Sequence, residues 1–578
     1  MRGRIVQAMN SIRMEKAKWI IFISTFLGLV FFIGYPLGNL IRTSLYNLQT
    51  HSYTLDVYIQ TFTDEELLGV FINTFKLAFG AVFFSFLVAI PMAWGVARTD
   101  MPLKKTIRSL VVLTFAIPSF LGTIGWITLL GPRAGKLNLL LVHLFNLEKA
   151  PFNIFSFEGI VFCATLYAYP VLFFVVSSAL ENMDASFEDA AQILGASRLR
   201  VLWSTTLPIV APAIISGCIL IFLEALVIFG VVIFLGSSIG FDTVSTKVFR
   251  LFFEIVPNFE KAASLSIPLF LVTCAILVFQ KKFIGKKQYT VIMGKAAQPQ
   301  MIKLGALKYI VCGYCFVWIS LSVFIPSLAL LSFALSKMVG YPLSLENFTL
   351  ANFAYIFSDQ TSFRAFKNSF TLALSATLMC LAVSVVISWI VQRSRIPGRG
   401  SLSFITMLSM SFPGVVLGVS LVLAFTNGPL RLYGTLWLFF LGYFIKGLPM
   451  AYMYTQAALK QLGEDLELAA RILGAGWLKS IWDVTAPLMS GSLLSAGIII
   501  FILKFRDMPL SMFLYSSGNE VVAVQIYQYQ EKGEYTMMAA GAIIILLMSL
   551  ILVVVSRKIE ERFKARLPGQ SRSNISEY

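Results

Sequence analysis

Twelve stretches of about 20 mostly apolar residues occur along this chain of 578 residues, and each is long enough to cross a bilayer as a helix. Only 13% of the residues are charged, whereas a soluble protein carries roughly a quarter. Because one aqueous core could not bury so many apolar side chains, we predict an all-α polytopic membrane protein with about 12 transmembrane helices. The predicted spans are 19–41, 70–97, 107–130, 159–180, 209–235, 264–280, 309–336, 365–392, 401–425, 433–457, 488–515 and 536–556.

The basic residues predict how these spans are oriented. Lys and Arg number 46 against 29 Asp and Glu, which gives a net charge of +17. If the N-terminus is cytoplasmic, 30 of the 46 basic residues fall in cytoplasmic segments, which is the usual bias of membrane proteins. We therefore expect both termini to be cytoplasmic and the first span to be a retained anchor. The excess charge then reflects orientation and does not indicate nucleic-acid binding.

The two halves of the chain repeat each other. Asn73-Thr-Phe-Lys-Leu-Ala matches Asn368-Ser-Phe-Thr-Leu-Ala at an offset of 295, and later positions match at an offset of 279. Six spans per copy is an even number, so the copies share one orientation and form parallel repeats. We expect a cytoplasmic N-terminus (1–18), a first half (19–283), a basic cytoplasmic linker (284–308), a second half (309–556) and a basic cytoplasmic tail (557–578).

Each half carries a distinctive loop between its fourth and fifth spans, the first motif loop at 181–208 and the second at 458–487. Acidic residues near the start of each loop favour a helix N-terminus, paired alanines allow close approach of another surface, and a glycine can end the helix in a left-handed conformation. We predict a helix, a turn and a second helix in each loop. The motif residues are Glu188, Asp189, Ala190, Ala191, Gly195 and Pro208 in the first copy, and Glu467, Ala469, Ala470, Gly474 and Pro487 in the second.

This spacing resembles the hallmark of the permease subunits of bacterial binding-protein-dependent ABC importers, a cytoplasmic Glu-Ala-Ala followed by glycine and then proline. Asp189 and Leu468 replace the glutamate directly before the paired alanines, while Glu188 and Glu467 lie one residue earlier. Which acid contacts the partner therefore stays open. The resemblance covers roughly residues 70–280 and 365–556 and implies the fold of type I ABC importer permeases in a bacterial cytoplasmic (inner) membrane.

The resemblance also implies a mechanism and partners. In this family an extracytoplasmic substrate-binding protein delivers the solute, and two copies of a cytoplasmic ATPase contact the motif loops and drive alternating access. The chain contains no phosphate-binding Gly-x-x-x-x-Gly-Lys-Ser/Thr motif, so we expect no enzymatic activity and no bound cofactor, with ATP and Mg²⁺ held by the ATPase. Fused two-half permeases of this kind are most similar to ferric iron transport permeases, including the stretch Lys504-Phe-Arg-Asp507-Met-Pro509. Thiamine, aminoethylphosphonate and polyamine remain alternative substrates.

Polar residues within the spans are candidates for the translocation path, because charges in a bilayer usually face a cavity or a partner. The repeat places Glu224 beside Lys504, and the alternatives are an ion pair between the halves or a lining of the path. Asn73 and Asn368 occupy matching positions, and we expect their side chains to bridge helices by hydrogen bonds rather than to contact substrate. The path candidates are Glu224, Lys504, Arg506, Asp507, Asn73 and Asn368.

A metal site and a secondary transporter are two alternative hypotheses for this chain. A Cys-x-x-Cys at Cys312 and Cys315 lies inside a span with no companion ligands, and the two histidines, His51 and His143, stand alone in predicted outside loops. We therefore predict no metal site. A secondary transporter driven by an ion gradient is the alternative class, but it would leave the paired motif loops without a role.

Overall fold

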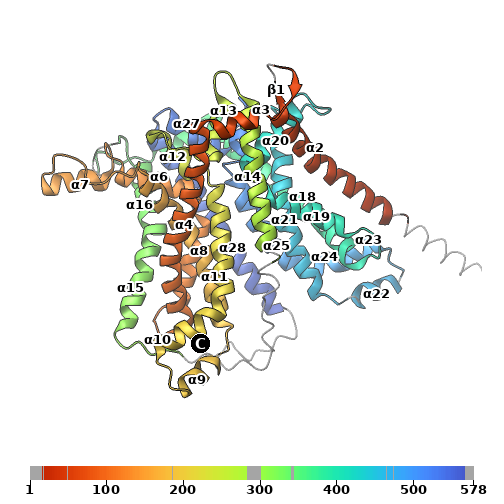
Figure 1. The fold of residues 1–578 in the computed structure, drawn as a ribbon, viewed down its shortest axis with the longest axis horizontal. Helices are drawn as coiled ribbons and strands as arrows, with labels where there is room; N and C mark the ends of the chain where they lie inside the picture. Colours follow the sequence, from red (N-terminus) through yellow and green to blue (C-terminus); the bar gives the residue numbers. More distant parts are fainter. Residues whose placement is uncertain are drawn as a thin grey trace, which may run out of the picture. The chain divides into compact units, whose positions relative to one another are not determined.

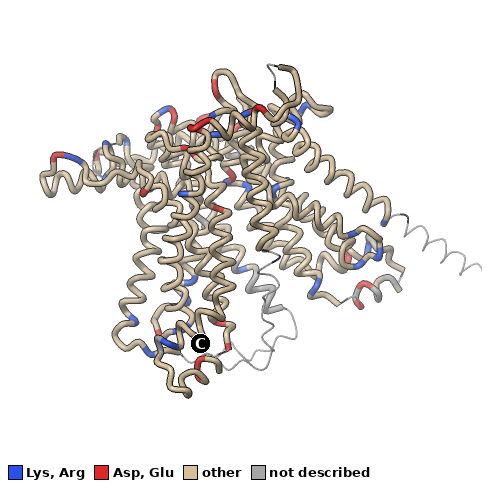
Figure 2. Tube along the Cα trace, in the orientation of Figure 1, with Lys and Arg blue, Asp and Glu red and all other residues tan. Residues whose placement is uncertain are grey.

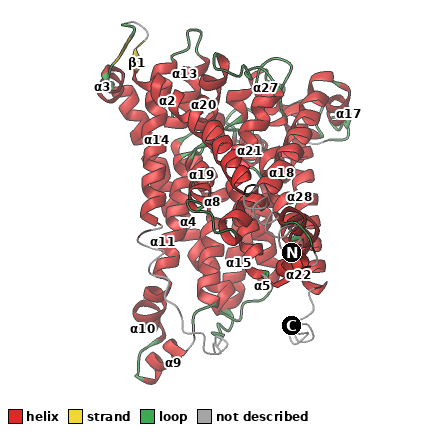
Figure 3. Cartoon of the chain, turned by 90° about the vertical axis from the view of Figure 1, so that its right-hand side faces the viewer, coloured by secondary structure: helices red, strands yellow, loops and turns green. Residues whose placement is uncertain are grey.

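The computed structural model describes residues 16, 18–47, 50–184, 186–280, 282, 301–339, 341, 344–463, 465–472 and 474–566. The described chain is almost entirely helical (Figure 3). Nine of its helices are long and apolar enough to cross a membrane, and the number rises to twelve if each of three bent helix pairs is one span. Most of the predicted N-terminal segment, the linker up to residue 300 and the tail from residue 567 lie outside the described residues.

The chain divides into two compact units, which we name after their longest helices. The α4 unit comprises residues 44–358 and 526–546, and the α18 unit comprises residues 1–43, 359–525 and 547–578. The α4 unit contains β1 (Tyr46–Asn47), β2 (Ser52–Tyr53), α3 (Asp56–Thr63), α4 (Glu65–Arg98), α5 (Lys104–Ala116), α6 (Ser119–Leu130), α7 (Lys136–Phe145), α8 (Phe157–Glu181), α9 (Ser186–Ile193), α10 (Arg198–Val201), η2 (Leu202–Thr206), α11 (Leu207–Leu226), α12 (Gly230–Leu235), η3 (Ser237–Ile239), α13 (Val244–Phe253), α14 (Phe259–Phe279), α15 (Leu307–Ile319), η6 (Ser320–Phe324), α16 (Ile325–Ala334) and α17 (Ala351–Ser358).

Most of the α18 unit comes from the second half of the sequence, whose helices follow one another in the same order as those of the first half. In the α4 unit, β1 and β2 pair as one antiparallel hairpin. The α18 unit contains η1 (Val30–Gly34), most of α2 (Tyr35–Leu45), α18 (Gln360–Arg393), α19 (Gly400–Leu408), η7 (Ser409–Ser411), α20 (Gly414–Thr426), α21 (Leu436–Gln461), α22 (Asp465–Ile472), α23 (Trp477–Ser480), η8 (Ile481–Thr485), α24 (Ala486–Leu488), α25 (Ser490–Phe505) and α26 (Ser511–Leu514), while α27 (Val522–Glu531) and α28 (Tyr535–Arg566) contribute residues to both units.

The longest helix of each unit is defined by matching residues at both ends. Asp64 caps α4 by accepting from the backbone N–H of Glu66 at 3.0 Å, and Asp359 caps α18 by accepting from that of Ser362 at 2.8 Å. Both helices are 34 residues long and end at an arginine. Helix α4 lies beside α8 and α11, and α18 beside α21 and α25 (Figure 1). Charged residues are sparse along these helices and more frequent in loops and at helix ends (Figure 2).

Each unit includes the first helix of the other sequence half. The segment α15–α16, which begins the second half, packs on α4, α5 and α6 in the α4 unit. In the α18 unit, Phe31 and Tyr35 of the first span pack edge-to-face on Phe425. The sequence halves 19–283 and 309–556 stay a prediction, and the compact units differ from them in that each contains the first helix of the other half.

Three spans that we predicted as continuous helices are bent. The predicted span 401–425 is α19 and η7 followed by α20, with a bend of 108°. Its cause is Pro413, because the residue before a proline is pushed out of the helical region, and Phe412 is extended at φ −80° and ψ 113°. Pro118 has the same effect on Ile117 between α5 and α6. The third bend separates 481–488 from 490–505 by 72°.

Candidate functional site: two matching motif loops

The first motif loop has the predicted helix–turn–helix form. Helix α9 ends in a turn at Gly195, α10 and the π-helical η2 follow, and the chain continues into α11. Gly195 has a φ of +86°, and the next residue, Ala196, donates its backbone N–H to the Ala191 carbonyl at 3.1 Å. This is the left-handed helix end that glycine favours.

The second motif loop repeats this geometry. Helix α22 ends at Ile472, Gly474 has a φ of +93°, and Ala475 donates its backbone N–H to the Ala470 carbonyl at 3.0 Å. A Cβ added at Gly195 or Gly474 would meet no atom within 4 Å. The glycines are therefore required by backbone conformation and not by packing.

Apolar side chains at the ends of the short helices point to solvent. Ile193 and Leu194 are 85% and 88% exposed at the end of α9, and Ile472 is 85% exposed at the matching position of α22. Ala190 and Ala469 are exposed as well. An exposed apolar tip on a short helix suits insertion into a groove on another protein.

The glutamates of the two motif loops face the opposite way, into the body of each unit. Glu188 forms an ion pair with Arg98, the last residue of α4, with 2.6 Å between Oε2 and the guanidinium nitrogen. Its other oxygen accepts a hydrogen bond from Thr206 at 2.5 Å. Arg98 is 1% exposed, so the carboxylate neutralises a cation that has almost no access to water.

The same three residue types meet in the α18 unit. Glu467 accepts from Thr485 at 3.0 Å and lies 3.8 Å from the Nε of Arg393, the last residue of α18. Trp389 donates its indole N–H to the second oxygen of Glu467 at 2.9 Å, and Arg393 also donates to the carbonyls of Leu459 and Leu462. We call Arg98, Glu188 and Thr206, and Arg393, Glu467 and Thr485, the two Arg–Glu–Thr clusters.

The clusters involve one of the two adjacent acids of the first motif loop, and which of these acids contacts a partner stays a prediction. Glu188 and Glu467 are occupied by internal partners, whereas Asp189 is half-buried and makes no hydrogen bond or ion pair with the described residues. Sequence analysis did not assign a role to the arginines or the threonines. A signal was present, since Arg98 and Arg393 match at the offset of 295, and Thr206 and Thr485 at that of 279.

The two span asparagines bind loop backbone. Asn73 donates to the Asp242 carbonyl at 3.3 Å, and Asn368 to the Glu520 carbonyl at 3.0 Å. The residue after each asparagine assists, because Thr74 and Ser369 accept backbone N–H groups near the starts of α13 and α27. Each pair thus joins a long helix both to a loop and to the first residue of the helix that follows that loop.

The charged path candidates divide between the units. Asp507 forms an ion pair with Lys446, and Lys504 lies close by within the α18 unit. Arg506 ends α25 and is half-buried. Glu224 is an exposed residue of α11 in the α4 unit, so its pairing with Lys504 stays a prediction. Among the described residues, no three of His, Cys, Asp or Glu are grouped as metal ligands, and all six cysteines are free thiols.

The chain is similar in sequence to several known transport permeases, and parts of it align with a solved transporter. The ferric transport system permease protein FbpB of Actinobacillus pleuropneumoniae is 26% identical over 552 residues, which are 93% of this chain and 78% of that protein. The putative 2-aminoethylphosphonate transport system permease protein PhnU of Salmonella typhimurium is 28% identical over 232 residues, 40% of this chain and 79% of that protein. A solved bacterial ABC transporter that imports alginate aligns with a TM-score of 0.37 and 16% identity, over 44% of this chain and 95% of its own.

Fold and site together define a multi-pass membrane protein with two repeats, each carrying one motif loop. Residues 85–283 and 384–565 match the family of binding-protein-dependent transport system inner membrane components, and the chain belongs to that family. Each matched segment contains one motif loop and all three residues of its Arg–Glu–Thr cluster. The protein is therefore a non-enzymatic permease component of an ABC importer, and its family works with a substrate-binding protein.

Proposed function

We propose that this permease moves ferric iron from the periplasm or exterior to the cytoplasm by ATP-driven alternating access. The relative FbpB, which is a ferric transport permease by name, matches 93% of this chain and so supports iron over the alternatives. PhnU matches 40% and supports aminoethylphosphonate as a second candidate. Thiamine and polyamine rest on the resemblance alone.

The observation that carries the coupling part of this proposal is the repeated design of the motif loops. Each has an exposed apolar tip on one side and, on the other, an Arg–Glu pair in which at least one partner is buried. We infer that each tip docks on one copy of a cytoplasmic ATPase, which holds the ATP and Mg²⁺ and performs the hydrolysis. Both termini would then be cytoplasmic, in agreement with the distribution of basic residues.

The Arg–Glu–Thr clusters would transmit the movement of a docked ATPase from the motif loop to a long helix. A short surface helix that moves alone transmits little, whereas one joined to a 34-residue helix by a buried ion pair moves that helix with it. In this mechanism the chain contributes no covalent chemistry. It supplies two rigid connections between the ATPases and the helices α4 and α18.

Reconstitution tests the proposal. The chain is incorporated into proteoliposomes with its cognate ATPase and binding protein, and uptake of ⁵⁵Fe is measured with and without ATP. We expect uptake only when all components and ATP are present. Competition with thiamine, aminoethylphosphonate or a polyamine identifies the cargo if iron is not taken up. Transport by the chain alone under a proton gradient would overturn the proposal in favour of a secondary transporter.

A further inference from the structure

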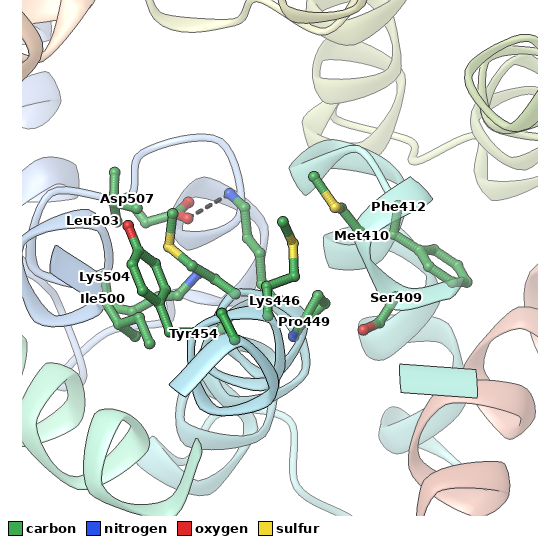
Figure 4. Close-up of a pocket in the computed structure, with 14 residues that line it drawn as sticks. Ser409, Met410, Phe412, Lys446, Pro449, Tyr454, Ile500, Leu503, Lys504 and Asp507 are labelled. Carbon is green, nitrogen blue, oxygen red and sulfur yellow. Dashed lines mark hydrogen bonds and ion pairs between the residues drawn. The ribbon is translucent and has the colours of Figure 1, made fainter. Parts of the chain in front are cut away.

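A cavity of about 580 Å³ lies within the α18 unit, at a point where helices are interrupted. It is lined by η7 at the bend before α20, by the middle of α21 and by the last turn of α25 (Figure 4). Helix interruptions inside a membrane protein leave backbone dipoles unpaired and are tolerated where they line a cavity or are buried in protein. The position therefore favours a cavity that receives polar groups.

The charged side chains of this cavity do not balance. Figure 4 shows Lys446 and Asp507 joined as an ion pair at its wall. Lys504 also lines the cavity, and it is only 4% exposed. Its ammonium makes no hydrogen bond or ion pair of 4.0 Å or less with any residue that the structure describes. With Lys446 neutralised by Asp507, the cavity keeps one positive charge.

The fold does not require these charges, as the other repeat shows. At the offset of 279, Tyr167, Ala225 and Ile228 occupy the positions of Lys446, Lys504 and Asp507. In the α4 unit the Tyr167 hydroxyl fills the space beside Gly122, where an added Cβ would lie 1.5 Å from it. These three positions thus carry neutral side chains in one repeat and two lysines and an aspartate in the other, while the exposed Glu224 matches the cavity-lining Leu503.

We propose that this cavity binds an anionic, oxygen-bearing group of the transported solute, and that Lys504 is its principal cation. A bound anion supplies the charge that the buried ammonium lacks, and Lys504 lies in the last helical turn, where backbone carbonyls also favour a cation. Lys446, held by Asp507, is placed to donate a second hydrogen bond. This assignment rests on the proposed import function and names the chemistry of its cargo.

A bare ferric ion does not fit the same residues. A hard cation is bound by several oxygen ligands, whereas the cavity offers the hydroxyls of Ser409 and Tyr454, two ammonium groups and one carboxylate that is already paired. Iron would therefore pass this point as a complex whose ligands carry negative charge. The walls contain Met410, Met450 and Met453, whose flexible side chains adapt to ligands of different shape.

Equilibrium binding to the full chain in lipid nanodiscs tests this inference without ATP, ATPase or binding protein. The probes are [³²P]phosphate, [¹⁴C]citrate and ⁵⁵Fe-labelled ferric citrate, which distinguish a free oxyanion from a metal complex. We expect the wild-type chain to bind at least one probe and Lys504→Met to weaken that binding at least tenfold. Lys504→Arg keeps the charge and should retain binding to within about threefold.

The matched control is Lys76→Met, which removes another span lysine that is exposed on α4 of the other unit. It should bind as the wild type does. Lys504→Met removes a buried unpaired charge, so its thermal stability should be preserved, and Lys504→Gln repeats the test if it is not. Absence of binding by the wild-type chain, or equal binding by Lys504→Met, overturns the inference. Failure of ATP-driven uptake with intact binding would instead contradict the proposed function.

Discussion

At the scale of single residues, the motif glutamates serve the interior of the protein. Glu188 and Glu467 each neutralise an arginine at the end of a long helix and accept from a threonine. The sequence also allows these glutamates to contact a partner, because their loop is on the surface and their side chains are charged, and that role stays a prediction. Only the direction of the side chain separates the two roles.

Removal of Glu188 tests the α4 cluster. Glu188→Ala leaves Arg98 buried without a counter-charge, and losing one partner of a buried pair costs about 3–5 kcal/mol. We expect a lower free energy of unfolding, seen as a fall in Tm in detergent, together with loss of ATP-driven uptake.

The neighbouring acid provides the control for that variant. Asp189→Ala removes a half-buried carboxylate that has no internal partner among the described residues, so its free energy of unfolding should stay within about 1 kcal/mol of the wild-type value. The double variant Arg98→Met with Glu188→Leu should recover most of the stability because no charge stays buried. Normal uptake by the double variant would contradict a coupling role for the ion pair.

At the scale of elements, the two motif loops show how one glycine defines a short helix. In both loops the helix ends in the left-handed region, and the chain reverses into a second helix. No neighbouring atom crowds either glycine. Each loop therefore requires glycine only for its positive φ. Substitution of the glycine by alanine, which adds one methyl group, tests this requirement.

Gly474→Ala adds one methyl group at a φ of +93°. A left-handed conformation costs a residue with Cβ about 1–2 kcal/mol, so we expect α22 to lose its defined end and ATP-driven uptake to fall several-fold. ATPase binding to the chain, measured by co-purification, should weaken in parallel.

Gly476→Ala is the matched control within the same loop. Gly476 has no left-handed φ, and an added Cβ there also meets open space. Its stability and uptake should stay near the wild-type values. Equal loss of uptake in both variants would show that the loop is sensitive to any added side chain and not to the helix end.

At the scale of the whole molecule, the two sequence halves exchange their first helices. Residues 1–43 belong to the α18 unit, and α15 and α16 belong to the α4 unit. Each unit therefore needs both halves of the chain to complete its apolar core. The two sequence halves are therefore held together by packing within each unit as well as by the covalent chain between them.

Separate expression of the halves tests this dependence. A chain ending at residue 290 and a chain starting at residue 301, produced together with a tag on the first, should co-purify because each supplies a helix to the other's unit. The control is a second chain that starts at residue 344 and so lacks α15 and α16. Recovery of that shortened chain at the same yield would show that the exchanged helix contributes little.

Sequence patterns alone determined the membrane class, the two repeats, the location of the motif loops and their glycine-terminated helices. These properties follow from local features, namely the length of apolar stretches, residue spacing and the backbone preferences of glycine and proline. The bend at Pro413 was accessible in the same way, because a proline excludes the helical conformation from the residue before it.

Tertiary structure alone decided the rest. Three features depend on residues far apart in the chain. They are the ion pair of Arg98 with Glu188, the exchange of first helices, and the surroundings of Lys504, which leave its charge unpaired among the described residues. Periodicity cannot assign such contacts, since a helix pattern shows that a residue is on a face but not which helix covers that face. For a buried charge the covering helix matters most, because the presence of a counter-charge there distinguishes a structural ion pair from a ligand site.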